Sequence, residues 1–343
     1  MIKIIHWIKL HQIVAFFLIT FGFVYLIAVP GIFLTIEDTP IKMIVQFILV
    51  QILLFSPALA GLAVTYIISD KQKKPLTTQQ LILFSITLVA GCFVSWLYRI
   101  VTHQNSMQLS LLILTTILSA IFPAFIISRA FSSVAGVRAY LGSIINPRGK
   151  IVWYLVAIFS FPLIHIFGNL ITGIINRDAL HSISGFNINL LSVACITFLS
   201  VFFFTGGVNE ESGWRGFAIP RLQNKYNPLI ACLVVWFFHM LWELPGDVIF
   251  SDFSWPAMSR LVWMPSWSVL FVWVYNRTNG SILAPILFHA SMNAMNPLMG
   301  VLPPTNIGTG LLIAFALFAI IYDRMWNKLP ATHPAVYSRF LRY

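Results

Sequence analysis

The chain consists largely of long apolar runs separated by short polar or basic stretches. A helix needs about 20 apolar residues to cross the hydrocarbon core of a bilayer, and runs of roughly this length recur throughout the sequence. The pattern predicts an all-α bundle of about ten membrane-spanning helices. Counts of eight or nine are also compatible with it, because the eighth run is short and the sixth and ninth carry polar residues. The segments are 13–36, 43–68, 81–98, 108–128, 151–175, 187–207, 228–245, 261–275, 281–299 and 307–325.

The distribution of Lys and Arg gives this bundle an orientation. With a cytoplasmic N-terminus and ten spans, 17 of the 21 basic residues fall on the cytoplasmic side, as the positive-inside rule requires. Both termini are therefore predicted to be cytoplasmic. The cytoplasmic set is Lys3, Lys9, Lys71, Lys73, Lys74, Arg129, Arg138, Arg148, Lys150, Arg215, Arg221, Lys225, Arg277, Arg324, Lys328, Arg339 and Arg342. The other four are Lys42, Arg99, Arg177 and Arg260.

Composition supports a multi-pass membrane protein. Hydrophobic residues make up 59% of the chain and charged residues 9%, against roughly 45–50% and about 25% in soluble domains. We expect the chain to lie in the inner (plasma) membrane, with its first apolar run retained because it is too long for the core of a signal peptide. The net charge of +11 does not indicate a nucleic-acid partner, since the basic residues lie in short loops between apolar runs.

Three parts of the chain are predicted. Residues 1–150 hold N-terminal spans without an assigned role, residues 151–327 hold the functional core, and residues 328–343 form a short basic cytoplasmic tail. Each of the three cysteines lies inside an apolar run, at spacings that match no disulfide framework or zinc ribbon. They are interpreted as packing residues.

Two adjacent carboxylates stand out in a chain that has ten acidic residues in all. Glu210 and Glu211 follow the apolar run 190–205, at the predicted cytoplasmic end of the sixth span. Charged groups beside a bilayer segment are costly and are functional candidates by default. Neighbours on a helix diverge by about 100°, whereas Glu211 and Arg215 are four residues apart and can pair along one face. Glu210 is then free for another partner. An ordinary ion pair at a helix end is the simpler alternative.

Two further polar pairs occur inside predicted spans. His239 lies eleven residues after Pro228, roughly 16 Å into the seventh span, and Glu243 follows on the same face. His289 lies roughly 12 Å into the ninth span, with Asn293 again four residues later. Hydrogen bonding between helices would explain each pair alone. Together with the two carboxylates they place polar groups of three helices at similar depth.

This set of side chains is typical of a metal hydrolase. Imidazole and carboxylate groups suit zinc, and a catalytic zinc keeps one position for water. A nearby carboxylate can act as general base towards that water, and an amide can donate to the oxyanion. The HExxH spacing of soluble zinc proteases and the GxSxG elbow of serine hydrolases do not accompany these residues.

At these residues the sequence resembles the CPBP (Abi) family of CAAX prenyl endopeptidases and bacteriocin-processing proteins. The family's EExxxR motif stands at Glu210–Arg215 as EESGWR and continues through Gly216–Gln223 as in bacterial members. Its HxxxN motif stands at His289–Asn293 as HASMN, and the preceding Tyr275–Ser281 also resembles the family. The resemblance covers about residues 190–300, and the first four spans match no family that we can name.

The family's FxxxH motif is altered in this chain. One register places Val235 in the aromatic position and His239 in the histidine position. The other follows the common Trp-His-Leu-Pro ending, which stands here as Trp242–Pro245 and puts Glu243 in place of the histidine. The first register keeps the ligand type and the second keeps the surrounding residues. The resemblance implies a metal, expected to be zinc, held by His289 and by His239, with Glu243 as the alternative to His239.

The resemblance also implies an activity. The protein would be an intramembrane endopeptidase that cleaves a peptide or membrane-protein substrate near the cytoplasmic side. Glu210 would activate the attacking water, Glu211 and Arg215 would hold the helix end, and Asn293 would steady the oxyanion. Two alternatives stay open: a non-catalytic scaffold or bacteriocin-immunity protein, which the altered motif favours, and a transporter. The transporter fits less well because no internal repeat is evident.

Overall fold

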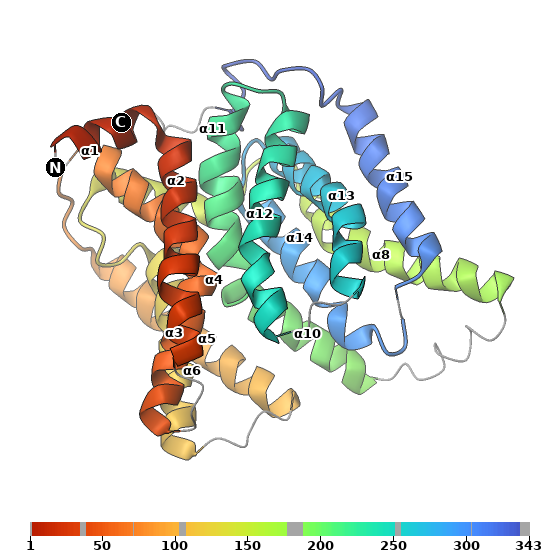
Figure 1. Ribbon diagram of the computed structural model, residues 1–343, viewed down its shortest axis with the longest axis horizontal. Coiled ribbons are helices and arrows are strands. Elements are labelled where there is room, and N and C mark those ends of the chain that lie inside the picture. The colour runs from red at the N-terminus through yellow and green to blue at the C-terminus, as the bar shows by residue number, and fades with distance from the viewer. Residues whose placement is uncertain are drawn as a thin grey trace.

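The computed structural model describes residues 2–34, 39–70, 72–102, 108–176, 188–250, 255–302 and 304–336. For residues 247–250 and 255–262 it describes the backbone alone. Lys71, Arg177, Arg339 and Arg342, which entered the topology argument, lie outside the described residues. The described parts of the chain form helices joined by turns (Figure 1), together with one isolated bridge between Lys73 and Val134. The predicted all-α membrane fold is confirmed.

Seven helices in the described parts of the chain are long and apolar enough to cross a membrane. Each corresponds to one of the first seven predicted segments. They are Gln12–Leu34, Pro40–Ile68, Thr78–Val101, Leu109–Ser128, Val152–Ile175, Ile188–Gln223 and Pro228–Gly246, and Asn306–Tyr322 is a shorter apolar helix. The predicted ninth segment forms a helix of 11 residues, about 16 Å long, which is too short to cross a core of about 30 Å by itself.

The helices fall into two groups along the sequence. The first group is α1 (Ile2–Leu10), α2 (Gln12–Phe21), π-helical η1 (Gly22–Ala28), α3 (Val29–Leu34), α4 (Pro40–Ile68), α5 (Thr78–Val101), α6 (Leu109–Ser128), α7 (Ala135–Ile144) and α8 (Val152–Ile175). The second is α10 (Ile188–Phe203), π-helical η3 (Gly207–Glu211) and η4 (Trp214–Ala218), α11 (Ile219–Gln223), α12 (Pro228–Phe250), α13 (Trp255–Arg277), α14 (Leu283–Asn293), the 3₁₀ turn η5 (Asn296–Leu298) and α15 (Asn306–Tyr322).

Threonine side chains start three of the helices. Thr39 and Thr305 accept hydrogen bonds from the backbone N–H groups of the first turns of α4 and α15. Thr77 forms a reciprocal capping box with Gln80 at the start of α5. Such caps satisfy backbone donors that a helix start leaves without partners. The local sequence therefore sets these boundaries where long apolar runs alone would leave them undefined.

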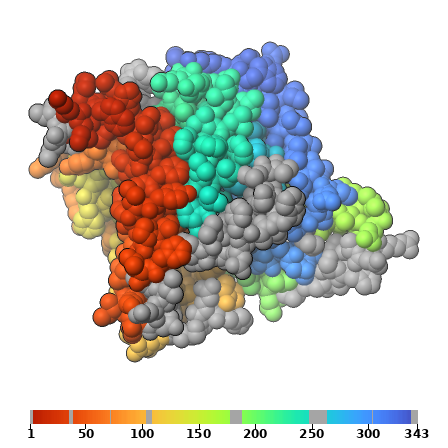
Figure 2. Space-filling view, viewed as in Figure 1, coloured from red at the N-terminus to blue at the C-terminus, as the bar shows by residue number. Residues whose placement is uncertain are grey.

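The N-terminal helices pack along the second group. Figures 1 and 2 show α2, in red, beside the teal α12 on the face in view. Phe17 of α2 stacks on Phe238 of α12 with ring centroids 3.9 Å apart, and the Tyr25 hydroxyl donates to the Leu241 carbonyl at 2.6 Å. The chain regions before and after residue 150 thus share one packed core.

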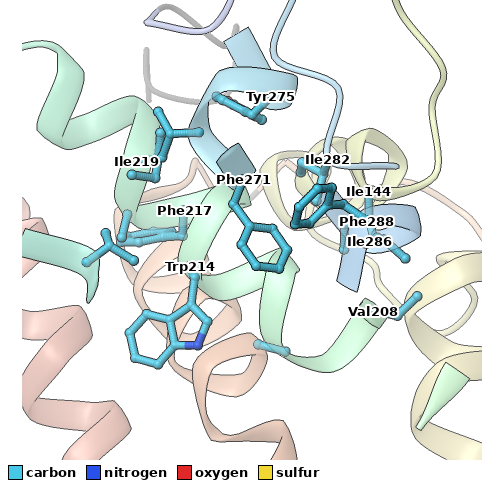
Figure 3. Packing of buried hydrophobic residues seen from close by; sticks show 14 of the residues in the cluster. Ile144, Val208, Trp214, Phe217, Ile219, Phe271, Tyr275, Ile282, Ile286 and Phe288 are labelled. Carbon is cyan, nitrogen blue, oxygen red and sulfur yellow. The ribbon is translucent and has the colours of Figure 1, made fainter. Parts of the chain in front are cut away.

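The segment after α10 departs from its prediction. The topology prediction counts Arg215, Arg221 and Lys225 in a cytoplasmic loop between the sixth and seventh spans, although it expects the Glu211–Arg215 pair on a helix end. Residues 207–223 instead continue as buried helical turns, and Arg215 is only 1% exposed. Figure 3 shows why: Trp214 and Phe217 point into a core shared with Phe271. Apolar side chains interleaved with the charges fill the interior, while the charges pair with one another.

Candidate active site

A tight turn at Gly206 places the two carboxylates. Gly206 has φ 115°, a conformation that residues with a Cβ rarely adopt. Its N–H donates to Asn209 Oδ1 at 2.7 Å, and Asn209 Nδ2 donates to the Leu54 carbonyl of α4 at 3.0 Å. The π-helical turn η3 follows and ends at Glu211. The turn and its link to α4 therefore fix the direction of the carboxylate-bearing segment.

Glu211 binds two partners through one oxygen. Arg215 Nη1 donates to Glu211 Oε1 at 2.9 Å, and His289 Nδ1 lies 2.8 Å from the same atom. Arg215 also lies over the Phe271 ring, with its guanidinium carbon 4.0 Å from the ring centroid. The Glu211–Arg215 pair predicted from the four-residue spacing is confirmed. Because both groups are buried, the pair is part of the core, and the contact of Glu211 with His289 links η3 to α14.

Glu210 faces the second pair of polar residues. Its Oε2 lies 3.0 Å from His239 Nε2, and the same nitrogen is 3.4 Å from Glu243 Oε1. Trp214 stacks against the His239 ring with centroids 5.1 Å apart and planes 26° apart. His239 is thus held between two carboxylates and an indole. The two residues that compete for one position in the sequence motif lie together beside Glu210.

This group could hold a metal ion. Glu210, His239 and Glu243 each offer one ligand atom, and these atoms lie within 4.8 Å of one another. One imidazole nitrogen and two carboxylate oxygens are a donor set that divalent metals accept, with further positions left for water. His289 is not among the three residues of this group, and its Nδ1 lies 2.8 Å from Glu211 Oε1. Of the two histidines that the sequence proposed as ligands, His239 belongs to the group.

A cavity of about 570 Å³ opens in front of these carboxylates. Glu210, Glu243 and His289 lie in its wall, and so does Asn293, one turn beyond His289. The remaining lining comes from α8, α13, α14, the α14–α15 connection and α15. These residues are Phe161, Ile164, His165, Asn169, Trp263, Met264, Trp267, Met292, Asn296, Met299, Pro304, Thr305, Gly308, Thr309 and Leu312.

The site is braced from the N-terminal half of the chain. Trp242 Nε1 donates to Ser56 Oγ of α4 at 2.7 Å. A Cβ at Gly213 would lie 2.5 Å from the Pro57 backbone, so the backbone at Gly213 is in direct contact with α4. The Tyr140 hydroxyl of α7 donates to the Ser212 carbonyl at 2.5 Å, and burial raises the pKa of Tyr140 above its usual range. Helices before residue 150 thus form part of the support of Glu210 and Glu211.

The sequence alone does not reveal several of these residues. Trp214 stands inside the EExxxR motif without any sign of its contact with His239, and nothing in the pattern marks the turn residues Gly206 and Asn209. His165 and Asn169 in α8 are spaced four apart inside an apolar span, which is the same pattern that singled out His239 and Glu243. That pattern could have identified them. The turn could not have been identified in this way, because its contacts to Leu54 depend on the fold.

Comparison with known proteins gives the family of the central segment. Residues 191–295 match the family described as type II CAAX prenyl endopeptidase Rce1-like. A protein named CAAX prenyl protease 2 from Methanococcus maripaludis is 27% identical over 125 residues. The aligned part covers 34% of this chain and 46% of that relative, which is less than half of the relative's length. The resemblance stated for residues 190–300 is confirmed.

Proposed function

We propose that this chain is an intramembrane endopeptidase that hydrolyses a peptide bond with water activated at Glu210, since its residues 191–295 match the family of type II CAAX prenyl endopeptidases. One observation carries the proposal. The buried Glu210 carboxylate lies in the wall of a cavity of about 570 Å³ and is held by His239 at 3.0 Å. A positioned carboxylate at the wall of a partly enclosed cavity is what general-base catalysis requires.

Glu210 has the contacts expected of the base. His239 orients one of its oxygens, and Glu211 is committed to Arg215 and His289 through Oε1. The adjacent carboxylates therefore differ in their roles: Glu210 accepts a proton from water, while Glu211 positions other groups. Arg215 completes the Glu211 pair and acts as a positioning residue.

His289 and Asn293 are proposed to act on the substrate carbonyl. Both lie in the cavity wall on α14. Glu211 binds His289 Nδ1, which fixes the ring orientation and leaves Nε2 as the atom available for a substrate or polarised water. The Asn293 amide can donate to the oxyanion that forms when water adds to the carbonyl.

His239 and Glu243, together with one oxygen of Glu210, offer a donor set that suits a divalent metal, and we propose zinc; the second oxygen of Glu210 would remain to accept the proton from water. A bound ion would supply Lewis-acid polarisation and a lowered pKa for bound water. The ligand atoms of the three side chains already lie within 4.8 Å of one another, and Trp214 stacks on His239. Glu243 then complements His239 in this site and does not replace it.

The remaining assignments follow from the membrane fold. We propose that residues 151–327 form the catalytic core of a multi-pass protein of the inner membrane, that residues 1–150 brace it, and that residues 328–343 form its tail. With both termini cytoplasmic, cleavage would occur near the cytoplasmic side. The relative's name suggests a lipidated CAAX peptide as the first substrate to test, and the tail of a membrane protein is the second.

Cleavage assays of the purified protein in lipid nanodiscs test the proposal. We expect wild-type protein to cleave a farnesylated CAAX peptide or a membrane-protein tail, and Glu210→Gln to lose about 10²–10⁴-fold in rate, since it removes the base and keeps the shape. Asp70→Asn, at an exposed position after α4, is the matched control and should keep full activity. Full activity of Glu210→Gln would refute the mechanism. An immunity phenotype that survives Glu210→Gln in a protein without cleavage would favour the scaffold alternative.

Metal content tests the ligand set separately. We expect about one zinc per wild-type chain by mass spectrometry of the metal, and a large loss in both His239→Gln and Glu243→Gln. His289→Gln serves as the contrast, because it lies outside the Glu210–His239–Glu243 group, and it should keep its metal while losing activity. Loss of metal in His289→Gln with retention in Glu243→Gln would contradict the assignment.

A further inference from the structure

The far wall of the cavity comes from outside the family-matched segment. Of the 19 lining residues, eleven lie before residue 191 or after residue 295. Most of them belong to α8 and α15 or to the turn before α15, and these two helices lie side by side in Figure 1, at the right of the view. The match therefore covers the carboxylates and His289, while a different part of the chain forms the surface that faces them.

A close helix crossing fixes this wall. A Cβ built on Gly168 of α8 would lie 2.6 Å from the Gly308 Cα of α15, so the two backbones are in contact. Small residues permit such an approach between membrane helices. The crossing sets the rotation and the height of α8 and α15 relative to one another. Side chains on the same faces near the crossing are therefore held in fixed positions.

Four polar side chains lie around the crossing in matching positions. On α8, His165 and Asn169 stand three residues before and one residue after Gly168, and both line the cavity. At the start of α15, the capping residue Thr305 and the helical residue Thr309 have the same spacing around Gly308 and also line the cavity. These four side chains are called the polar wall. Polar groups on membrane helices face cavities or partners in preference to lipid.

The polar wall is built into the structure at two points. Asn169 is 95% buried, and its Nδ2 donates to the His165 carbonyl at 2.9 Å. Thr305 Oγ1 accepts the Gly308 N–H at 2.9 Å, so this hydroxyl still has its own proton to donate. Both contacts hold polar atoms at the cavity surface. The wall offers neutral donors and acceptors of the kind that bind peptide groups.

The rest of the cavity limits what can bind there. Trp263, Trp267, Met264 and Met299 are among its apolar lining residues, and they suit uncharged side chains. Among the described lining residues none is Lys or Arg, whereas Glu210 and Glu243 are carboxylates. A carboxylate or phosphate on the ligand would meet these two carboxylates, and the basic groups that it could meet among the described lining residues are the imidazoles of His165 and His289. The chemistry fits an uncharged, extended stretch of a peptide.

We propose that the polar wall is a substrate subsite that hydrogen-bonds the backbone of an uncharged, extended peptide opposite the carboxylates. The subsite rests on the proposed peptidase function, because it explains how a peptide is held against Glu210. His165, Asn169, Thr305 and Thr309 bind peptide N–H and C=O groups, while the Trp and Met side chains contact the side chains of the substrate. The backbone contacts on this side come from α8, α15 and the turn before α15, outside the matched segment, whereas Trp263, Met264 and Trp267 lie within it.

Binding to a protein that cannot cleave tests the subsite. Fluorescence anisotropy in nanodiscs, with Glu210→Gln as background, measures the affinity for a short fluorescein-labelled farnesylated peptide with an amidated C-terminus. A second peptide carries N-methyl groups on its backbone after the cysteine. We expect His165→Leu and Thr309→Val each to weaken binding of the first peptide by about 5- to 10-fold. N-methylation of the peptide should weaken its binding to the background protein. It should weaken binding to the two variants less, because each variant has already lost a hydrogen bond that the methyl groups would remove.

Two variants separate binding from folding. Thr309→Ser keeps the hydroxyl and should restore affinity. Thr172→Val, on α8, is the matched control, because its hydroxyl donates to its own helix at the Gly168 carbonyl and it does not line the cavity. The subsite proposal would be overturned by any of three results. These are equal peptide affinity of His165→Leu, Thr309→Val and the background protein, the same effect of N-methylation in all three proteins, or no binding of the peptide to the background protein. Since the readout is binding, failure of cleavage by the wild-type protein is a separate result that bears on the peptidase proposal.

Discussion

The turn at Gly206 offers a sharp test of how the site is positioned. In Gly206→Ala, the new Cβ would lie 2.4 Å from His289 Nε2, where ordinary contacts begin at 3.4 Å. The imidazole must therefore move by about 1 Å, and a displacement of this size costs about 10²-fold in rate at a catalytic centre. The φ of 115° adds about 1–3 kcal/mol of backbone strain. We expect a folded, less stable protein with about a hundredfold lower kcat.

A substitution at a second glycine separates the effect of backbone strain from the effect of displacing His289. Gly280 has φ 75°, and its Cβ would lie 3.0 Å from the Ala335 backbone, beside the C-terminal segment and not beside His289. Gly280→Ala should lower the melting temperature in detergent by a comparable amount and leave kcat near the wild-type value. The assays are thermal unfolding followed by fluorescence and cleavage of the peptide that the wild-type protein accepts. Undiminished activity of Gly206→Ala, or an equal loss of activity in Gly280→Ala, would refute the reasoning.

Three further substitutions test the support of the site. Arg215→Met leaves the buried Glu211 carboxylate without its ion-pair partner and should cost about 3–5 kcal/mol in the free energy of unfolding, measured by denaturant titration; a change below 1 kcal/mol would contradict the pairing. Tyr140→Phe removes the hydrogen bond to the Ser212 carbonyl and should cost about 1 kcal/mol in the same titration. Gly168→Ala forces α8 away from α15 and should weaken binding of the peptide about tenfold or destabilise the protein by about 1–3 kcal/mol; a variant that matches wild type in both would show that the contact is not tight.

The apolar pattern predicted the first seven helices because membrane spans have a simple requirement, about 20 apolar residues in succession. The segment 207–223 breaks this rule. It carries Glu210, Glu211 and Arg215, and a count of charges places it in a loop. In the structure these charges pair with one another or with histidines. Pairing offsets most of the free-energy cost of burying these charges, which is the cost that favoured a loop. The pairing depends on histidines that lie far away in the sequence.

Helical spacing predicted the local pairs in the site. The four-residue intervals of Glu211 with Arg215 and of His239 with Glu243 both correspond to contacts. The spacing could not predict which carboxylate would contact which histidine. Glu210 lies at His239 and Glu211 lies at His289, because the turn at residues 204–206 and the packing of α4, α12 and α14 decide the direction of each side chain.

The contacts of α4 and α7 with the site have a consequence for attempts to isolate a minimal enzyme. Asn209, Ser212, Gly213 and Trp242 each depend on a partner that lies more than seventy residues earlier in the chain. A fragment limited to residues 191–295 would expose these groups to lipid or water and lose the framework that directs Glu210. The smallest active unit should therefore begin no later than α4. A shorter fragment should regain activity only when α4–α7 are supplied as a separate chain that assembles with it in the membrane.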